Sequence, residues 1–412
     1  MLFLLSMITY MDRVCLGLAG KRIQEDLQLS STQMGIIMGF FALAYAAFEI
    51  PSGSMGDRIG PRRVLTRIVI WWSAFTTLTG AVRGFASMLV TQIFFGAGEA
   101  GAYPNSSSAI SRWFPMKERG RAQGVVWMAS RCGGAFAPFL VVPIQAMYGW
   151  RMSFYVFGSI GFIWAAVWYF WYRDHPAEKA GVTKEELAEI GGGLRSAHVP
   201  MPWSIATKKR NFWMILLMYH TYCWGSYFYL SWLPNYLQKG RGFTESELRY
   251  TVVLPFIAGI CGNFFGGSLS DHLVQRKGLR FGRVAVGATG LAVAAVCMLS
   301  TALTPNKYAA VAFLTLGYGS MDCMLPVSWA ICLDVGRKYA GAMTGSMNMA
   351  GQVGSFLTSI FFGKMVDAFG SYNLPLIPMA GMLLLSAAIY TRIDPTDQLV
   401  PESEPAQLPA HA

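Results

Sequence analysis

Hydrophobic residues in this chain form twelve long runs, and short polar segments separate them. An α-helix needs about 20 mostly apolar residues to cross the roughly 30 Å hydrocarbon core of a bilayer. The pattern therefore predicts an all-α membrane protein with twelve transmembrane helices. The predicted spans are residues 1–20, 33–55, 64–84, 86–111, 122–147, 152–172, 212–237, 248–270, 282–303, 308–333, 342–366 and 374–391.

The composition excludes a soluble domain, because 54% of the residues are hydrophobic and only 13% are charged. The formal net charge is +11, but the basic residues are spread over short loops, so we expect no nucleic-acid partner. The seven cysteines lie inside apolar runs without metal-ligand spacing, and their number is odd. They are predicted to be free thiols, and we expect no metal site.

Lys and Arg are more frequent in the loops after even-numbered spans and in the C-terminal tail than in the other loops. By the positive-inside rule, both termini and the long loop 173–211 are expected in the cytoplasm of an integral plasma-membrane protein, in the inner membrane if it is bacterial. The first span starts at the initiator Met without a basic flank, so its early turns are expected to be missing or its start misassigned. No cleavable signal peptide is predicted.

The order of the spans indicates two related halves. Residues 1–172 are predicted to form one six-helix bundle and residues 212–392 another, joined by a cytoplasmic linker, 173–211, with a short surface helix at 183–190. Similar polar segments, GDRIGPRR and SDHLVQRKG, follow the second span of each half and contain Asp57 and Asp271. Residues 393–412 lack periodicity and are predicted to be a disordered tail.

Five charged residues interrupt the apolar spans: Asp12, Arg13, Glu99, Arg131 and Asp322. A charge at the centre of a membrane helix costs about 2.5–3.5 kcal/mol on insertion scales, so such residues face one another or a wet cavity. All five are expected within a few turns of the midplane. They indicate a transport site. The alternative is a set of structural ion pairs that hold helices together, and this alternative is stronger for Asp322 than for the others.

Other motifs do not support an enzyme. GAGEAG at residues 96–101 matches a dinucleotide-binding pattern, but no strand precedes it. Asn105-Ser-Ser matches a glycosylation acceptor inside a membrane span. The sequence has no Walker A motif and no nucleophile motif, so we expect no catalytic residues, no ATP-driven step and no cofactor.

Residues 53–63 (GSMGDRIGPRR) resemble the loop signature of the major facilitator superfamily, whose fold is two six-helix bundles around a central cavity. Residues 10–13 (YMDR), 96–115 (GAGEAGAYPNSSSAISRWFP), 149–154 (GWRMSF) and 231–237 (SWLPNYL) resemble its anion:cation symporter branch. That branch includes bacterial hexuronate, galactonate and glucarate transporters, the vesicular glutamate transporters and sialin. The resemblance covers the chain except its tail.

In this family the signature loop closes the cytoplasmic side against span eleven, so the resemblance implies a cytoplasmic gate. Glycines permit a tight turn between packed helices, and an Asp at a helix end can pair with Arg or with helix N-terminal amides. A purely topogenic basic loop is the alternative, mainly for the arginines. The predicted gate residues are Gly56, Asp57, Arg58, Gly60, Arg62, Arg63 and Asp271.

The resemblance also assigns proton binding to Asp12 and Glu99, and binding of the substrate carboxylate to Arg13. Fully ionised, the five intramembrane charges sum to −1, and with Asp12 and Glu99 protonated they sum to +1. The site with both protons bound therefore attracts an anion, and the site without them repels it. Further cavity candidates, from the resemblance and residue type, are Tyr10, Tyr45, Trp329, Asn348 and Gln352.

One position departs from the family pattern. Many branch members carry an Arg two helical turns before the Glu of span four, where this chain has Gln92. Arg131 is predicted either to replace that cation as the partner of Glu99 or to bind substrate directly. Asp322 is a further candidate for coupling.

Taken together, the sequence predicts a monomeric secondary transporter that moves a small organic anion, a sugar acid or related carboxylate, by proton symport. Titratable partners of Arg13 favour symport over an anion exchanger or uniporter, which can rely on Arg alone. A polytopic sensor or enzyme is disfavoured, because it would need a catalytic constellation or an added soluble domain.

Overall fold

The computed structural model describes residues 1–114, 116–190 and 201–399, and these residues are almost entirely helical, with no strand among them. Every predicted span coincides with one helix or with successive helices, and the span 212–237 also includes the short α11 (Leu233–Asn235). In the first half these are α1 (Leu2–Leu27), α2 (Ser31–Ile59), α3 (Pro61–Thr79), α4 (Phe85–Glu99), α5 (Ala102–Trp113), α6 (Met116–Tyr148) and α7 (Trp150–Trp171). In the second half they are α10 (Arg210–Ser231), α12 (Glu245–Thr251), α13 (Val253–Lys277), α14 (Leu279–Leu303), α15 (Lys307–Asp322), α16 (Met324–Gly336), α17 (Ala340–Phe369) and α18 (Leu376–Tyr390).

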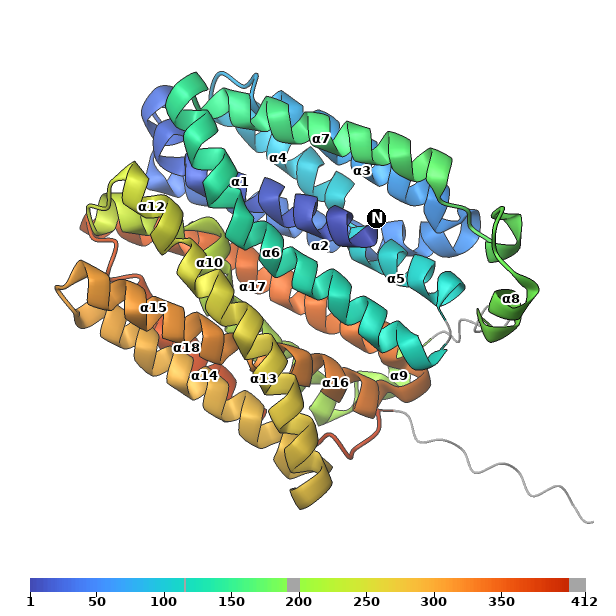
Figure 1. Cartoon of the computed structure of the whole chain (residues 1–412). Coiled ribbons are helices and arrows are strands. Elements are labelled where there is room, and N and C mark those ends of the chain that lie inside the picture. Colours follow the sequence, from blue (N-terminus) through green and yellow to red (C-terminus); the bar gives the residue numbers. More distant parts are fainter. Residues whose placement is uncertain (115, 191–200, 400–412) are drawn as a thin grey trace, which may run out of the picture.

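The long helices of the two halves run alongside one another, as Figure 1 shows, and short linker helices lie at one end. By length and hydropathy alone, seven of the described spans qualify as membrane-crossing. The linker contains α8 (Lys184–Ile190), where Thr183 and Glu186 cap each other with N–H···O distances of 3.2 and 2.9 Å. The predicted surface helix at 183–190 is confirmed.

Two spans that the sequence predicted as continuous are interrupted beside a buried carboxylate. Glu99 ends α4, and α5 starts after Gly101, which has φ +90°. A Cβ at Gly101 would lie 2.4 Å from the Cβ of Ser52, so only glycine permits this approach of the chain to α2. The second interruption, at Cys323, directly follows Asp322. Both acidic residues therefore lie at helix ends.

We call the end of the bundle that carries α8 and α9 (Trp203–Ala206) the linker end, and the opposite one the far end. At the far end α2 and α17, from different halves, pack backbone against backbone. A Cβ at Gly35 would lie 2.3 Å from the carbonyl oxygen of Ser359, and one at Gly363 would lie 2.2 Å from that of Ser31. Glycine at both positions makes this close contact possible.

Polar contacts between the halves accompany this packing. The Asp367 carboxylate, on α17, accepts from the backbone N–H groups of Ser31 (3.0 Å) and Thr32 (2.6 Å). These groups belong to the first turn of α2, where backbone donors lack helical partners and the helix dipole favours a negative charge. Arg22 and Glu245 form a second link at this end, with an N···O distance of 2.6 Å. The far end is therefore closed.

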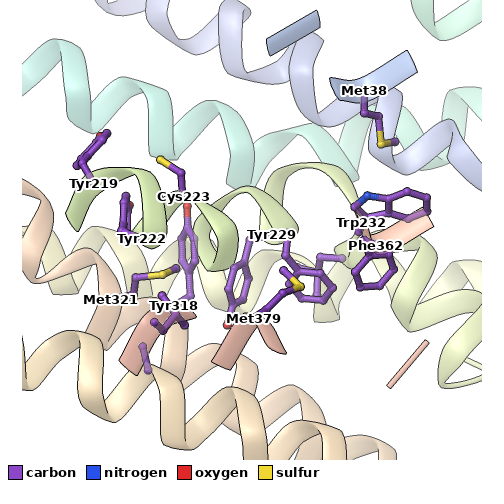
Figure 2. Packing of buried hydrophobic residues seen from close by; sticks show 14 of the residues in the cluster. Met38, Tyr219, Tyr222, Cys223, Tyr229, Trp232, Tyr318, Met321, Phe362 and Met379 are labelled. Atoms are coloured by element: carbon purple, nitrogen blue, oxygen red, sulfur yellow. The ribbon is translucent and has the colours of Figure 1, made fainter. Parts of the chain in front are cut away.

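A shared apolar core also joins the halves. Met38 of α2 lies in the same buried cluster as Trp232 and Phe362 of the second half, and Figure 2 shows it beside these rings. The Trp232 and Phe362 rings stack with centroids 4.8 Å apart.

Packing against the helices extends further toward the C-terminus than the sequence predicted. Ile393 and Leu399 are fully buried, the Leu399 N–H donates to the carbonyl of Val335 (3.1 Å), and Asn211 donates to the carbonyl of Asp394 (2.7 Å). The prediction of a disordered tail from residue 393 is therefore wrong for residues 393–399, because two isolated apolar side chains secure a segment that lacks any periodicity. Residues 400–412 lie outside the described residues.

Asp367→Asn should weaken closure of the far end, because the amide keeps one acceptor but loses the charge that interacts with the α2 dipole. We expect a cost of about 1 kcal/mol, or roughly a fivefold rise in the ratio of open to closed molecules. Electron–electron resonance between spin labels at Glu25 and Leu374, in a background without native cysteines, would measure the added population of long distances.

Asp26→Asn is the matched control, since Asp26 lies at the same end but pairs with Arg151 of its own half (2.5 Å). An unchanged distance distribution in the Asp367 variant would contradict a latch at this position.

Candidate transport site

A cavity of ≈ 90 Å³ lies between the two halves. Its walls come from α1, α2, α5 and α6 on one side and from α10, α16 and α17 on the other. All seven side chains that the sequence proposed for substrate binding line it. They are Tyr10, Arg13, Tyr45, Arg131, Trp329, Asn348 and Gln352.

Aromatic residues that the sequence reasoning missed form much of the remaining wall. Tyr103 and Trp127 stack with centroids 4.6 Å apart, and Trp127 packs on Trp329 of the other half at 5.3 Å. Residues of α10 also face the cavity at helical spacing, namely Tyr219, Tyr222, Cys223, Ser226, Tyr227 and Leu230. The signal for this face was present in the sequence as polar and aromatic positions at i, i+3, i+4 and i+7 of span seven.

Arg13 pairs with Glu99 inside the first half. The Arg13 Nε donates to Glu99 Oε1 at 2.9 Å, and the guanidinium lies near the rings of Tyr45 (4.8 Å) and Tyr10 (5.4 Å). The pair uses one oxygen of the carboxylate, while Glu99 Oε2 and Arg13 Nη2 are buried without a hydrogen-bond partner among the described residues. Arg13 thus keeps unused donor capacity at the cavity wall.

Asp12 lies next to this pair in the sequence but does not line the cavity. Its side chain is 3% exposed, and neither carboxylate oxygen has a partner in the described part of the chain. A buried carboxylate without donors is costly, and none of the described residues offers Asp12 a donor that would offset this cost.

Arg131 and Asp322 join the two halves, and the Arg131 guanidinium lies 5.9 Å from the centre of the Tyr10 ring on the cavity wall. Arg131 Nε and Nη2 lie 3.1 and 3.2 Å from the two Asp322 oxygens, and Nη1 donates to the hydroxyl of Tyr318 at 3.0 Å. Asn263 donates to the same carboxylate at 3.0 Å. The hypothesis that Arg131 pairs with Glu99 is therefore wrong in this structure, because Asp322 holds the guanidinium through both of its oxygens.

Gln92 makes no contact with either arginine in the described hydrogen bonds. Its amide donates to Thr79 Oγ1 at 3.0 Å, within the first half. It shares a small void of ≈ 20 Å³ with Arg13. The cation that pairs with Glu99 is thus Arg13, from α1, rather than a residue of α4 or α6.

Glu49 is a buried carboxylate on the cavity wall that the sequence analysis did not single out. It is 8% exposed, and the Asn348 amide donates to both of its oxygens at 2.7 and 2.8 Å, from the other half. The criterion used for Asp12 and Glu99, an acidic residue inside an apolar span, applies equally to Glu49 in the span 33–55.

The described contacts of the predicted gate loop go to its own half. Gly60 has φ +90° between α2 and α3, the Arg62 N–H donates to Asp174 (2.9 Å), and Arg62 Nε donates to the carbonyl of Tyr169 (2.8 Å). Gly56 packs against Asn105 so closely that a Cβ would overlap its side chain.

The other members of the gate set are placed as follows. Arg58 and Arg63 are exposed, and the side chain of Asp57 lies outside the described residues. In the second half, Asp271 pairs with Arg283 at 2.8 Å, and Arg283 also reaches Asp334 at 3.2 Å. The gate role of these residues stays a prediction.

Comparison with known proteins decides the family. The sequence model of the Major Facilitator Superfamily matches residues 2–359. The chain belongs to this superfamily. It is therefore an integral membrane transporter and not an enzyme, and the predicted fold of twelve helices in two bundles is confirmed.

Two named relatives show which members of the superfamily this chain resembles. The chain is 34% identical to the probable sulfoacetate transporter SauU of Cupriavidus necator and 30% identical to the hexuronate transporter of Bacillus subtilis. Each alignment covers 95% of this chain and 92% of the relative. Among solved structures, a bacterial homologue of the human lysosomal transporter Spinster, inward-facing and unoccupied, matches with a TM-score of 0.77, 20% identity and 95% coverage of both chains.

Asp322→Asn should destabilise the protein strongly, since it leaves Arg131 buried without a carboxylate. Breaking a buried ion pair from one side costs about 3–5 kcal/mol. Unfolding in mixed detergent micelles would measure this loss in the free energy of unfolding.

The double variant Arg131→Gln with Asp322→Asn should recover part of the loss, because no unpaired charge remains. In contrast, Gln92→Arg should not compensate for Arg131→Gln, because the partner of Glu99 is Arg13. A cost below about 1 kcal/mol for Asp322→Asn would contradict a structural pair.

Proposed function

We propose that this chain is a secondary active transporter that moves a small organic anion, a sugar acid or related carboxylate, together with protons across the plasma membrane. The observation that carries the proposal is the pairing of Arg13, at the cavity wall, with the buried Glu99, next to Asp12, which has no hydrogen-bond partner among the described residues. The names of the relatives, a hexuronate transporter and a probable sulfoacetate transporter, support an organic anion as substrate.

Proton and substrate movement are coupled because Glu99 and the acid group of the substrate compete for Arg13. When Glu99 is ionised, it occupies the Arg13 Nε and offsets the charge that would attract an anion. When Glu99 takes up a proton, the ion pair is lost, and Arg13 can present its planar N–H groups to the acid group of the substrate. Release of the proton restores the pair and displaces the anion. Substrate and proton are thus bound and released together.

The charges around the cavity support this order of events. Two arginines, Arg13 and Arg131, stand against four carboxylates, those of Asp12, Glu49, Glu99 and Asp322, so the fully ionised site carries −2. An anion enters such a site only after carboxylates have been neutralised. Asp12 is the second proton site in this proposal, because its buried carboxyl has no donor among the described residues to stabilise its charge.

Alternating access requires contacts between the halves that can separate. We assign the residues 1–172 and 212–392 to the two moving bundles, with 173–211 as the cytoplasmic linker and both termini in the cytoplasm of a monomer, in the plasma membrane, which is the inner membrane if the source is a bacterium. The loop from Gly56 to Arg63, with Asp271 in the second half, is the proposed gate at the linker end. Asn348, Gln352 and Trp329 supply substrate contacts from the second bundle.

Glu99→Gln should abolish uptake driven by a pH gradient while keeping counterflow of preloaded substrate, because the amide cannot release a proton. Reconstituted vesicles would be tested with hexuronates, galactonate, glucarate and sulfoacetate. Glu25→Gln is the control, since it makes the same change on an exposed residue of α1. Undiminished accumulation by the Glu99 variant would exclude this proton site and favour exchange.

Arg13→Lys should weaken binding of every transported anion about tenfold or more, because lysine keeps the charge but lacks the planar fork. Direct binding measurements on purified protein would test this, with Arg151→Lys as control, because Arg151 lies at the far end and pairs with Asp26. Wild-type affinity in the Arg13 variant would mean that Arg13 only holds helices together.

A further inference from the structure

Glu49 adds to the charge of the site, but the transport mechanism above gives it no contact with the proton or the substrate. It is a carboxylate on the wall of a cavity that has to accept an anion. Both arginines of that cavity are engaged by other carboxylates, Glu99 and Asp322. The one hydrogen-bond donor described for Glu49 is the neutral amide of Asn348. Glu49 therefore retains acceptor capacity that no described residue fills, since a carboxylate offers about four lone-pair sites.

The position of Glu49 relative to Arg13 fixes what it can contact. Glu49 follows Tyr45 by four residues on α2, so both side chains lie on the same helix face about 6 Å apart along the axis. The Tyr45 ring lies 4.8 Å from the guanidinium carbon of Arg13. A substrate with its acid group at Arg13 and its chain along Tyr45 places its other end at Glu49 and Asn348.

We propose that Glu49, oriented by Asn348, is a specificity-determining residue that accepts a hydrogen bond from a hydroxyl or ammonium group at the end of the substrate remote from its acid group. This inference rests on the proposed function, because it assumes that the acid group binds at Arg13. The substrate class is then an organic anion with a donor several carbons from the anionic end. A plain carboxylate of the same length leaves Glu49 without that donor.

The neighbouring groups fit this role. Asn348 comes from the other half, so its amide fixes both Glu49 oxygens only while the two halves enclose the cavity. Gln352, one turn along α17, lines the same wall and adds an amide beside the remote end of the substrate. A site built to pair with a substrate donor rejects the analogue that lacks it, because the buried acceptor stays unpaired.

The test uses three six-carbon monocarboxylates that differ only at the terminal carbon, namely hexanoate, 6-hydroxyhexanoate and 6-aminohexanoate, with galactonate as a polyhydroxy probe. Binding to the purified full-length protein is measured for each probe, and specificity is the ratio of each affinity to that of hexanoate. Glu49→Ala should lower these ratios about tenfold or more relative to wild type. Glu49→Gln keeps an acceptor oxygen, so it should lower the 6-aminohexanoate ratio more than the 6-hydroxyhexanoate ratio.

Several outcomes would overturn the inference. Affinities that stay at the wild-type value in both variants would do so, and so would an equal loss of affinity for all four probes, because the ratios are unchanged in both cases. The second result would make Glu49 a general structural or proton-binding residue. Glu25→Gln is the control for the charge change, and the isosteric Glu49→Gln variant keeps the test valid if Glu49→Ala does not fold.

Failure of the proposed function gives a different pattern. If wild type binds none of the four probes and none of the organic anions named above, no organic-anion site exists. If wild type binds these anions and Arg13→Lys lowers their affinity, while the affinity ratios to hexanoate do not depend on Glu49, the transport proposal stands. Only this inference then fails.

Discussion

The bilayer imposes one condition on which the whole interior of this protein depends: a charge that leaves water has to find a partner or become neutral. Arg13 meets this condition with Glu99 inside the first half, and Arg131 meets it with Asp322 across the two halves. The first pair leaves donors and acceptors unused, whereas the second is bidentate and supported by Tyr318 and Asn263. A loosely satisfied pair can exchange partners during a reaction cycle, and a fully satisfied one holds helices together.

The two ends of the molecule are joined by different means. At the far end, glycines bring the backbones of α2 and α17 together and Asp367 adds a charge at the start of α2. Towards the linker end, the described contacts between these same helices are those of side chains, such as the Glu49–Asn348 bond. Backbone contact at one end and side-chain contact nearer the other leaves the cavity enclosed by groups that can move without unfolding a helix.

Much of this arrangement could be predicted from the sequence, because the hydrophobic runs define the helices and the cost of buried charge identifies the ionic groups at and behind the cavity wall. The partners of those charges could not. The sequence left Glu99 and the substrate as alternative partners of Arg131, and only the rotation and depth of α6 relative to α15 reveal that it pairs with Asp322. The interruption at Gly101 was also hidden, since glycine is frequent throughout the apolar spans and many of these glycines make close contacts, so only the positive φ of Gly101 in the structure distinguishes it. Glu49 was detectable by the same charge criterion. In contrast, Ile393 and Leu399 are only two isolated apolar residues, too short a signal to predict packing of the C-terminal segment.

The position of the Arg131–Asp322 contact along its helices bears on how the two halves can move relative to each other. Arg131 lies at the middle of α6, and Asp322 lies at the junction of α15 and α16, the middle of that span. Two rigid bodies that stay joined at half height can tilt against each other without parting, and a tilt about such a point opens one end as it closes the other. In a transporter whose halves tilt in this way, the salt bridge would be the pivot, and the lengths of α6 and of the α15–α16 span on either side of it would set how far a small rotation opens each end.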